Sequence, residues 1–243
     1  MPLIQQHNIG ILPGSLKPGD IALKLNPESN LGPGWNKWGG GGFISNVISS
    51  LSYNPEYVHG GLAVGQGRLI EVNGMLPADN INGTRFFSNI YLTDIARDTP
   101  STSYDVWRCA DAGLGEDVAI QAYPFVAQGI NKSWGYNLGA ATASVGLMQA
   151  IHPQRPGTGG KPGQAPLREN PDAVDIALAE GRTFFCTQFV VWLYNVVSTR
   201  IQHRGHPAIP INDALAYPGM LAEVLQKRCS GRFTYVGCIR GVQ

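Results

Sequence analysis

One feature of the sequence limits the possible folds more than any other: two short apolar stretches flank a Gly-Gln-Gly turn. In YVHGGLAVGQGRLIEVNG, residues 57–74, apolar and other side chains largely alternate on both sides of residues 65–67. Such alternation is typical of half-buried strands, and a short glycine-containing loop between them is typical of a β-hairpin. The sequence therefore predicts an antiparallel hairpin over this stretch.

The register of this hairpin decides which polar side chain meets His59. Directly opposed residues of an antiparallel pair point to the same side of the sheet. The apolar residues of the two strands therefore face each other only if the two residue numbers of each opposed pair add up to an even number, which we call an even register sum. His59 then lies opposite Glu71 or Asn73. A loop centred on Gly65 favours Glu71, and a loop centred on Gln66 favours Asn73. Either residue can accept a hydrogen bond from the imidazole, and Glu71 would also stabilise the imidazolium by its charge.

Glycine and proline are frequent enough to argue against a regular helical bundle. The 243 residues include 31 glycines and 17 prolines, which implies many turns and a mixed α and β fold. Pro124 should interrupt one helix, and Pro218 should open another. We expect a Pro-Gly turn that leads into a short strand within 16–25, and further strands at 103–109 and 232–239. Helices are expected at 43–51, 116–128, 137–150 and 183–197, with one or two more within 212–226.

Residues 152–171 form the main break in composition, with five prolines, four glycines and almost no apolar side chains. We interpret them as a flexible insertion and not as a domain boundary, so residues 1–243 are expected to form a single domain. Asn170 and Pro171 suit the cap and first position of a following helix, which should end near Gly181.

The charge of the chain argues against partners that bind through broad electrostatic attraction. The net charge is +1, and only 14% of the residues are charged, so we expect no binding to nucleic acid or acidic membranes. No run approaches the roughly 18 apolar residues of a transmembrane helix. The opening residues lack the basic and apolar regions of an export signal, so we expect synthesis in the cytoplasm without a cleavable signal peptide.

The four cysteines are too sparse and irregularly spaced for a small disulfide scaffold, and no CxxC motif of a zinc or redox site occurs. A disulfide between two of Cys109, Cys229 and Cys238 stays open. We expect neither a metal ion nor a cofactor.

Cys186 lies at the front of the apolar run FFCTQFVVWLY, residues 184–194. If a helix begins near Cys186, the unpaired N–H groups of its first turn and the helix dipole favour the thiolate. The same N–H groups could hold a developing oxyanion. The alternative is simple packing, because free cysteines are among the most frequently buried residues. A nucleophilic role therefore requires a nearby imidazole.

Among the five histidines, His59 is the strongest partner for Cys186 because it lies inside a predicted strand. The two glycines that follow it weaken a strand and often mark a place where another backbone or a ligand comes close. The alternative is a half-buried structural histidine. His203 and His206 lie in a turn segment with only Asp213 as a nearby acid, which argues against a metal hydrolase.

Four segments together resemble the circularly permuted branch of the NlpC-type papain-like cysteine peptidases, such as YiiX and YaeF. In chain order they are KPGDIALKL, VHGGLAV, RLIEVNG and FFCTQFVVWLY. The resemblance implies an α+β fold in which an antiparallel sheet packs against helices, including the cysteine helix. By position it implies Cys186 as nucleophile, His59 as general base and Glu71 as orienting residue, with Asn73 as the alternative. Gln188 stands where Glu is common in that branch.

The chain is also similar to bacterial type VI secretion effectors of the TseH group. This resemblance implies a toxin that cleaves peptidoglycan stem peptides in the periplasm of a target cell, with a secretion apparatus and an immunity protein as partners. Two alternatives stay open. One is a lipid-directed acyltransferase or thioesterase on the same fold, as in lecithin:retinol acyltransferase-like enzymes, whose Asn-Cys-Glu-His motif is missing here. The other is a non-catalytic binding module.

Four residues are candidates for the wall of a substrate cleft, namely Asp20, Trp35, Trp38 and Tyr53. Asp20 could equally cap a turn.

Overall fold

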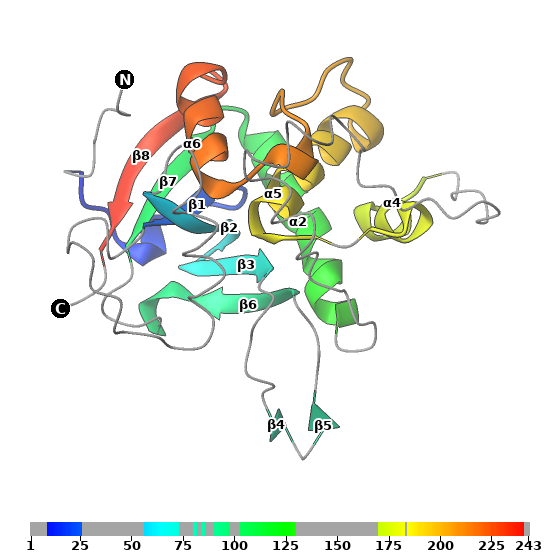
Figure 1. Cartoon of the computed structure of the whole chain (residues 1–243), viewed down its shortest axis with the longest axis horizontal. Helices are drawn as coiled ribbons and strands as arrows, with labels where there is room; N and C mark the ends of the chain where they lie inside the picture. The colour runs from blue at the N-terminus through cyan, green and yellow to red at the C-terminus, as the bar shows by residue number, and fades with distance from the viewer. Residues whose placement is uncertain are drawn as a thin grey trace, which may run out of the picture.

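The structure is a computed structural model that describes residues 9–25, 56–72, 80–81, 84–85, 90–97, 103–129, 170–182 and 184–240. Its centre is an open, antiparallel, six-stranded sheet with the strand order β6-β3-β2-β1-β7-β8 (Figure 1). A separate two-stranded ribbon contains β4 (Asn80–Ile81) and β5 (Thr84–Arg85). The strands of the main sheet are β1 (Ile21–Leu25), β2 (Tyr57–Gly65), β3 (Arg68–Val72), β6 (Ile90–Asp94), β7 (Tyr104–Cys109) and β8 (Phe233–Ile239).

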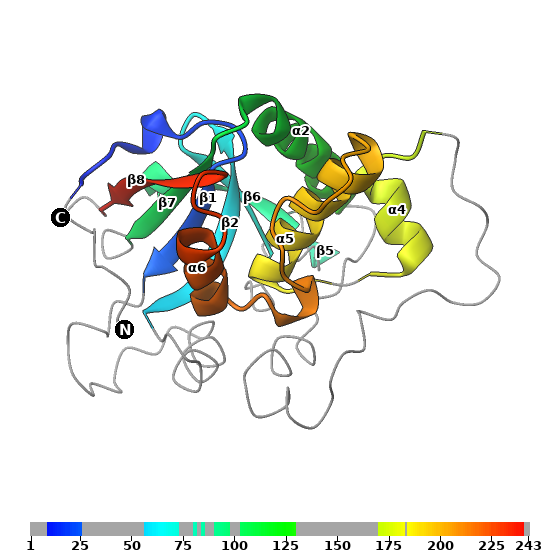
Figure 2. The same cartoon turned by 90° about the horizontal axis from the view of Figure 1, so that it is seen from above.

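The described residues also form four α-helices that pack with the sheet, which confirms the predicted α+β class. Figure 2 shows α2, α5 and α6 on one side of the sheet. Side-chain alternation explains this arrangement, because Ile21 and Leu23 of β1 pack into the core under the helices, whereas Ala22 packs into a smaller cluster. The helices are α2 (Ala112–Gly129), α4 (Ala173–Glu180), α5 (Cys186–Val196) and α6 (Pro218–Lys227).

The prediction that Pro124 interrupts its helix is wrong, because α2 runs through this residue to Gly129. The next residue, Phe125, is fully buried and packs edge-on against Phe189 with ring centroids 5.2 Å apart. Phe125 makes similar contacts with Phe184 and Trp192. This packing holds the helix together on both sides of the proline and outweighs the loss of one backbone hydrogen bond.

The start of one helix differs from the prediction because another side chain caps it. Helix α4 is capped by Asp172 and not by Asn170, since the Asp172 carboxylate accepts from the backbone N–H of Asp175 at 2.8 Å. Strand β1 begins at Ile21, after the predicted Pro-Gly turn, which covers residues 17–20. In this turn the Asp20 side chain accepts from the N–H of Lys17 at 2.8 Å.

Other boundaries follow the predictions closely. Helix α4 ends at Glu180 and is capped by Gly181, which adopts the left-handed conformation, and α6 begins at Pro218. The long apolar helix begins at Cys186, three residues after the predicted start, and a π-helical turn (Val197–Ile201) follows it. The predicted helices at 43–51 and 137–150, and all but the last two residues of the predicted insertion at 152–171, lie outside the described residues.

Cys109, Cys229 and Cys238 are all buried and free, so the structure contains no disulfide between them. In the part of the chain that the structure describes, no helix is both long enough and apolar enough to cross a bilayer.

Candidate active site

Cys186 is the first residue of α5 and is only 6% exposed. The preceding residue, Phe185, has an extended backbone (φ −108°, ψ 171°) and leads the chain into the helix. The Cys186 sulfur lies 3.9 Å from the Thr187 hydroxyl oxygen, and the backbone N–H of Thr187 helps to lower the pKa of the thiol. The thiol therefore lies at a helix start, as predicted, and contacts a donor of the first turn.

Gln188 holds this helix start in place from its third position. Its side-chain oxygen accepts from the N–H of Phe185 at 3.3 Å, which satisfies a donor that the helix cannot pair internally. Its amide nitrogen donates to Asp213 at 3.2 Å, and Asp213 also pairs with Arg182 at 2.6 Å. The resemblance leads one to expect Glu at this position. Gln188 caps the start of α5 without adding a charge, and its bond to Asp213 holds the side chain in place.

The imidazole of His59 lies against both Cys186 and Glu71. It lies close enough to Cys186 for the charge of each group to shift the pKa of the other, and its Nε2 atom lies 3.5 Å from Oε1 of Glu71. The His59 and Glu71 side chains are 14% and 4% exposed. Within the described residues, neither Nε2 nor Oε1 has a partner at normal hydrogen-bond geometry. The two atoms face each other just beyond bonding distance, and a small movement of either side chain would close the gap.

The hairpin has the even register sum that the sequence predicts, with Gly61 opposite Glu71 and Leu62 opposite Ile70. This register is centred on Gln66 and therefore places Glu71 diagonally from His59, not directly opposite it. Diagonal neighbours on one face of a sheet are close enough for long side chains to meet. Asn73, the other predicted partner, lies outside the described residues.

The glycine opposite Glu71 makes this diagonal approach possible. A Cβ atom on Gly61 would lie 2.8 Å from Cγ of Glu71, so any larger residue would displace the carboxylate. The neighbouring Gly60 has the same effect toward the helix, since a Cβ there would lie 2.6 Å from Cγ2 of Thr187. The two glycines after His59 therefore mark two close approaches, one by a strand and one by the cysteine helix.

Thr93 completes the cluster and was not found by the sequence analysis. Its hydroxyl donates to Oε2 of Glu71 at 2.6 Å, from the edge strand β6. This bond holds one carboxylate oxygen and leaves the other facing His59. The residues of β6 are too few and too mixed in polarity to predict a strand, so no local signal placed Thr93 near the hairpin.

The charges of Cys186 and His59 stabilise each other. Burial alone would raise the pKa of the Cys186 thiol, but the positive charge and hydrogen bond of His59 outweigh burial and lower this pKa below its ordinary value. Burial would lower the pKa of His59, but the Cys186 thiolate and the Glu71 carboxylate raise it. Both shifts favour the charged form of the group, so together they favour a thiolate–imidazolium pair.

Asp20 does not belong to this cluster. Asp20 is fully buried, and both of its carboxylate oxygens pair with Arg108 at 2.7–2.8 Å, so it caps a turn and is not a cleft wall residue. Trp35, Trp38 and Tyr53 lie outside the described residues. Within the described ranges, no group of three or more His, Cys, Asp or Glu side chains is arranged to bind a metal ion.

Comparison of this chain with family models, with curated proteins and with solved structures found no match.

Proposed function

We propose that this protein is a cysteine hydrolase of the permuted papain-like type that cleaves amide bonds. Cys186 is the nucleophile, His59 the general base and acid, and Glu71 the residue that orients His59. The observation that carries the proposal is that His59 and Cys186, from elements far apart in the chain, are buried beside each other. The residues that follow them, Gly60 and Thr187, are in close contact. A buried cysteine that served only for packing would need neither a histidine beside it nor a lowered pKa.

Each step of the proposed reaction uses a group that this cluster contains. The Cys186 thiolate attacks the carbonyl carbon of the substrate, and the electron pair of the C=O bond moves to the oxygen. Backbone N–H groups at the start of α5 stabilise this oxyanion. When the tetrahedral intermediate collapses, the C–N bond breaks, the protonated imidazole of His59 gives its proton to the departing nitrogen, and a thioester remains on Cys186.

Water then completes the cycle. Neutral His59 takes a proton from a water molecule, whose oxygen attacks the thioester carbon, and the C–S bond breaks to release the carboxylic acid and the thiolate. The Nε2 atom of His59 faces Glu71. This geometry leaves Nδ1 as the nitrogen that exchanges a proton with sulfur and substrate, while Glu71 holds the ring in that orientation.

The chain order supports the permuted form of the fold. His59 precedes Cys186, the reverse of the usual papain-like order, and the sheet is antiparallel with the cysteine helix packed on it. Peptidoglycan stem peptides are the substrate that the resemblance to type VI effectors favours. Delivery to the periplasm by a secretion apparatus, and an immunity protein that binds the enzyme, belong to the same proposal.

The test compares wild type, Cys186→Ala and His59→Ala on purified peptidoglycan, with mass analysis of the released fragments. Cys229→Ala is the matched control, because Cys229 is also buried and free but its pKa is raised by burial. We expect fragments from wild type and from Cys229→Ala and at least about 100-fold less from the other two variants. Equal release by all four proteins contradicts the mechanism.

A parallel assay on acyl esters in detergent separates the substrate classes. Ester cleavage that depends on Cys186, without release of peptidoglycan fragments, would replace the amidase proposal with the lipid-directed acyltransferase or thioesterase. If neither substrate is cleaved and Cys186 is alkylated slowly and without dependence on His59, the cluster is not catalytic.

A further inference from the structure

A cavity lies between α6, β7 and β8, and it contains none of the residues of the Cys186 site. Its volume is about 290 Å³, and its lining includes Tyr57, Asp105, Trp107, Gln226 and Tyr235. We call it the Asp105 pocket. It combines one carboxylate with four aromatic side chains, the fourth being Phe233, a set of groups that the proposed hydrolysis does not use.

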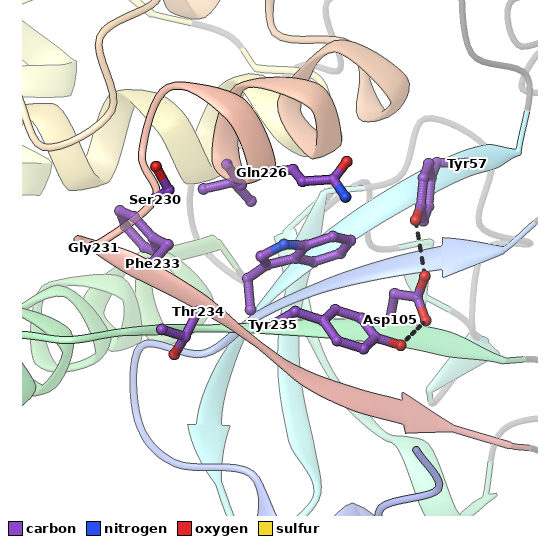
Figure 3. Close-up of a pocket in the computed structure, with 10 residues that line it drawn as sticks. Tyr57, Asp105, Gln226, Ser230, Gly231, Phe233, Thr234 and Tyr235 are labelled. Carbon is purple, nitrogen blue, oxygen red and sulfur yellow. Dashed lines mark hydrogen bonds between the residues drawn. The ribbon is translucent and has the colours of Figure 1, made fainter. Parts of the chain in front are cut away.

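Asp105 is held rigidly at the wall of this pocket. The Tyr57 hydroxyl donates to Oδ2 at 2.8 Å, and the Tyr235 hydroxyl donates to Oδ1 at 2.9 Å. Figure 3 shows the two hydroxyls converging on the carboxylate from different strands. Burial and the negative charge of Asp105 both raise the pKa of each phenol, so the phenols stay protonated and keep donating. The negative charge is therefore fixed in place.

The aromatic rings form inclined walls around this charge. Trp107 stands edge-on to Tyr57, with centroids 6.0 Å apart and planes at 66°, and edge-on to Tyr235 at 5.4 Å and 70°. Aromatic faces carry negative partial charge and attract cations. Among the described residues that line the pocket there is no Lys, Arg or His. The charge of Arg240, which directly follows β8, partly offsets the rise in the pKa of Tyr235, but Arg240 does not line the pocket.

We propose that the Asp105 pocket binds the ammonium group of a small organic amine. The carboxylate supplies the opposite charge and the rings supply cation–π attraction. The side chain of Gln226 extends from α6 on the same side as Tyr57 and adds an amide oxygen as an acceptor (Figure 3). The volume lies at the lower limit of pockets for drug-sized ligands, so the ligand is about as large as a lysine side chain. The source of the ammonium group is therefore a free alkylamine or a lysine side chain in a peptide.

The test follows the indole N–H signals of the five tryptophans by NMR and identifies the Trp107 signal by its loss in Trp107→Phe. Wild type is titrated with n-butylammonium and with its neutral counterpart n-butanol, then with acetyl-lysine amide and its ε-acetylated form. We expect saturable movement of the Trp107 signal with the two cations and at least tenfold weaker binding of the two neutral molecules. Tighter binding of butylammonium than of acetyl-lysine amide identifies a free amine as the source, and tighter binding of acetyl-lysine amide identifies a lysine side chain in a peptide.

Asp105→Asn should weaken cation binding at least tenfold, because it keeps the size of the side chain and removes its charge. Glu223→Gln is the matched control, since Glu223 lies on α6 but does not line the pocket. No saturable movement in wild type, equal binding of cation and neutral counterpart, or unchanged binding by a folded Asp105→Asn overturns the proposal. The wild-type titrations decide the matter even if Asp105→Asn does not fold. All of these measurements read binding, so they are independent of whether Cys186 cleaves a substrate.

Discussion

At the scale of single residues, the reactivity of Cys186 depends on His59 more than on the helix start. The positive charge and hydrogen bond of His59 lower the pKa of Cys186 more than the hydrogen bond from the Thr187 N–H does, and both act against burial. A helix start alone would leave burial as the largest effect, and burial favours the neutral thiol. The histidine therefore decides whether this cysteine is a nucleophile or a packing residue.

His59→Ala should slow alkylation of Cys186 by iodoacetamide at pH 7 by at least about tenfold. Without the imidazolium, burial raises the pKa of Cys186. At constant pH, an increase of one in this pKa reduces the thiolate fraction about tenfold. The measurement is the alkylation rate between pH 5 and 10, read by peptide mass spectrometry. His206→Ala, at an exposed histidine, should match wild type. A pH profile of His59→Ala that overlays wild type would show that the two side chains are not coupled.

Thr93→Val should slow hydrolysis about 3- to 10-fold and lower the pKa of His59. The substitution removes the hydrogen bond that holds Glu71, and the Glu71 charge is one cause of the raised pKa of His59. The alkaline limit of the thiolate–imidazolium range then moves to lower pH. NMR titration of the His59 imidazole measures this shift.

Thr93→Ser keeps the hydroxyl and should behave like wild type in both assays. If valine and serine at this position give the same His59 titration, Thr93 is structural and does not position Glu71.

At the scale of elements, the hairpin and the cysteine helix are locked together at Gly60. A Cβ atom there would lie 2.6 Å from Cγ2 of Thr187 and 2.8 Å from Cδ2 of Leu23, so it has no free space. The Thr187 hydroxyl also donates to the backbone oxygen of Ala216, just before α6. The start of α5 is thus fixed between β2 on one side and the segment before α6 on the other.

Gly60→Ala should lower the free energy of unfolding by about 1–3 kcal/mol, the typical cost of overpacking a core contact. Urea denaturation followed by circular dichroism measures it. Gly205→Ala is the control, because a Cβ at this exposed glycine meets nothing within 4 Å, and we expect a change within about 0.5 kcal/mol. Equal midpoints for the two variants would mean that α5 can move away from β2 without cost.

At the scale of the whole molecule, Asp20 ties the N-terminal segment to the sheet. It pairs with Arg108 of β7 through two hydrogen bonds, and its backbone oxygen accepts from Ala63 of β2 at 2.7 Å. The preceding residue, Gly19, accepts a hydrogen bond from the Tyr194 hydroxyl of α5. The Gly-Asp pair therefore joins two strands and the cysteine helix, which makes it structural and not catalytic.

Arg108→Leu should lower the free energy of unfolding by about 3–5 kcal/mol, because it leaves the Asp20 carboxylate buried without its cation. Lys227→Ala removes an exposed ion pair with Glu223 and should cost less than about 0.5 kcal/mol. Chemical denaturation of both variants tests the difference. Arg108→Leu as mild as Lys227→Ala would contradict the structural role of Asp20.

Local patterns in the chain were sufficient to predict the hairpin with its even register, the start of a helix near Cys186, and the helix starting at Pro218. Each of these features depends on side-chain alternation or on the backbone of a few neighbouring residues, which a short stretch of sequence contains. The same reasoning brought His59 and Cys186 forward as candidates, but it could not place them side by side.

Contacts between distant segments decided the rest. Helix α2 continues through Pro124 because aromatic side chains of α5 and its flank hold Phe125, and Thr93 reaches Glu71 only because β6 pairs with β3. The hairpin register permits two partners for His59, and the missing side chain of Gly61 is what lets Glu71 approach it diagonally. Such contacts depend on the order of the strands in the sheet and on how the helices pack against it. A short stretch of sequence contains no information about either arrangement.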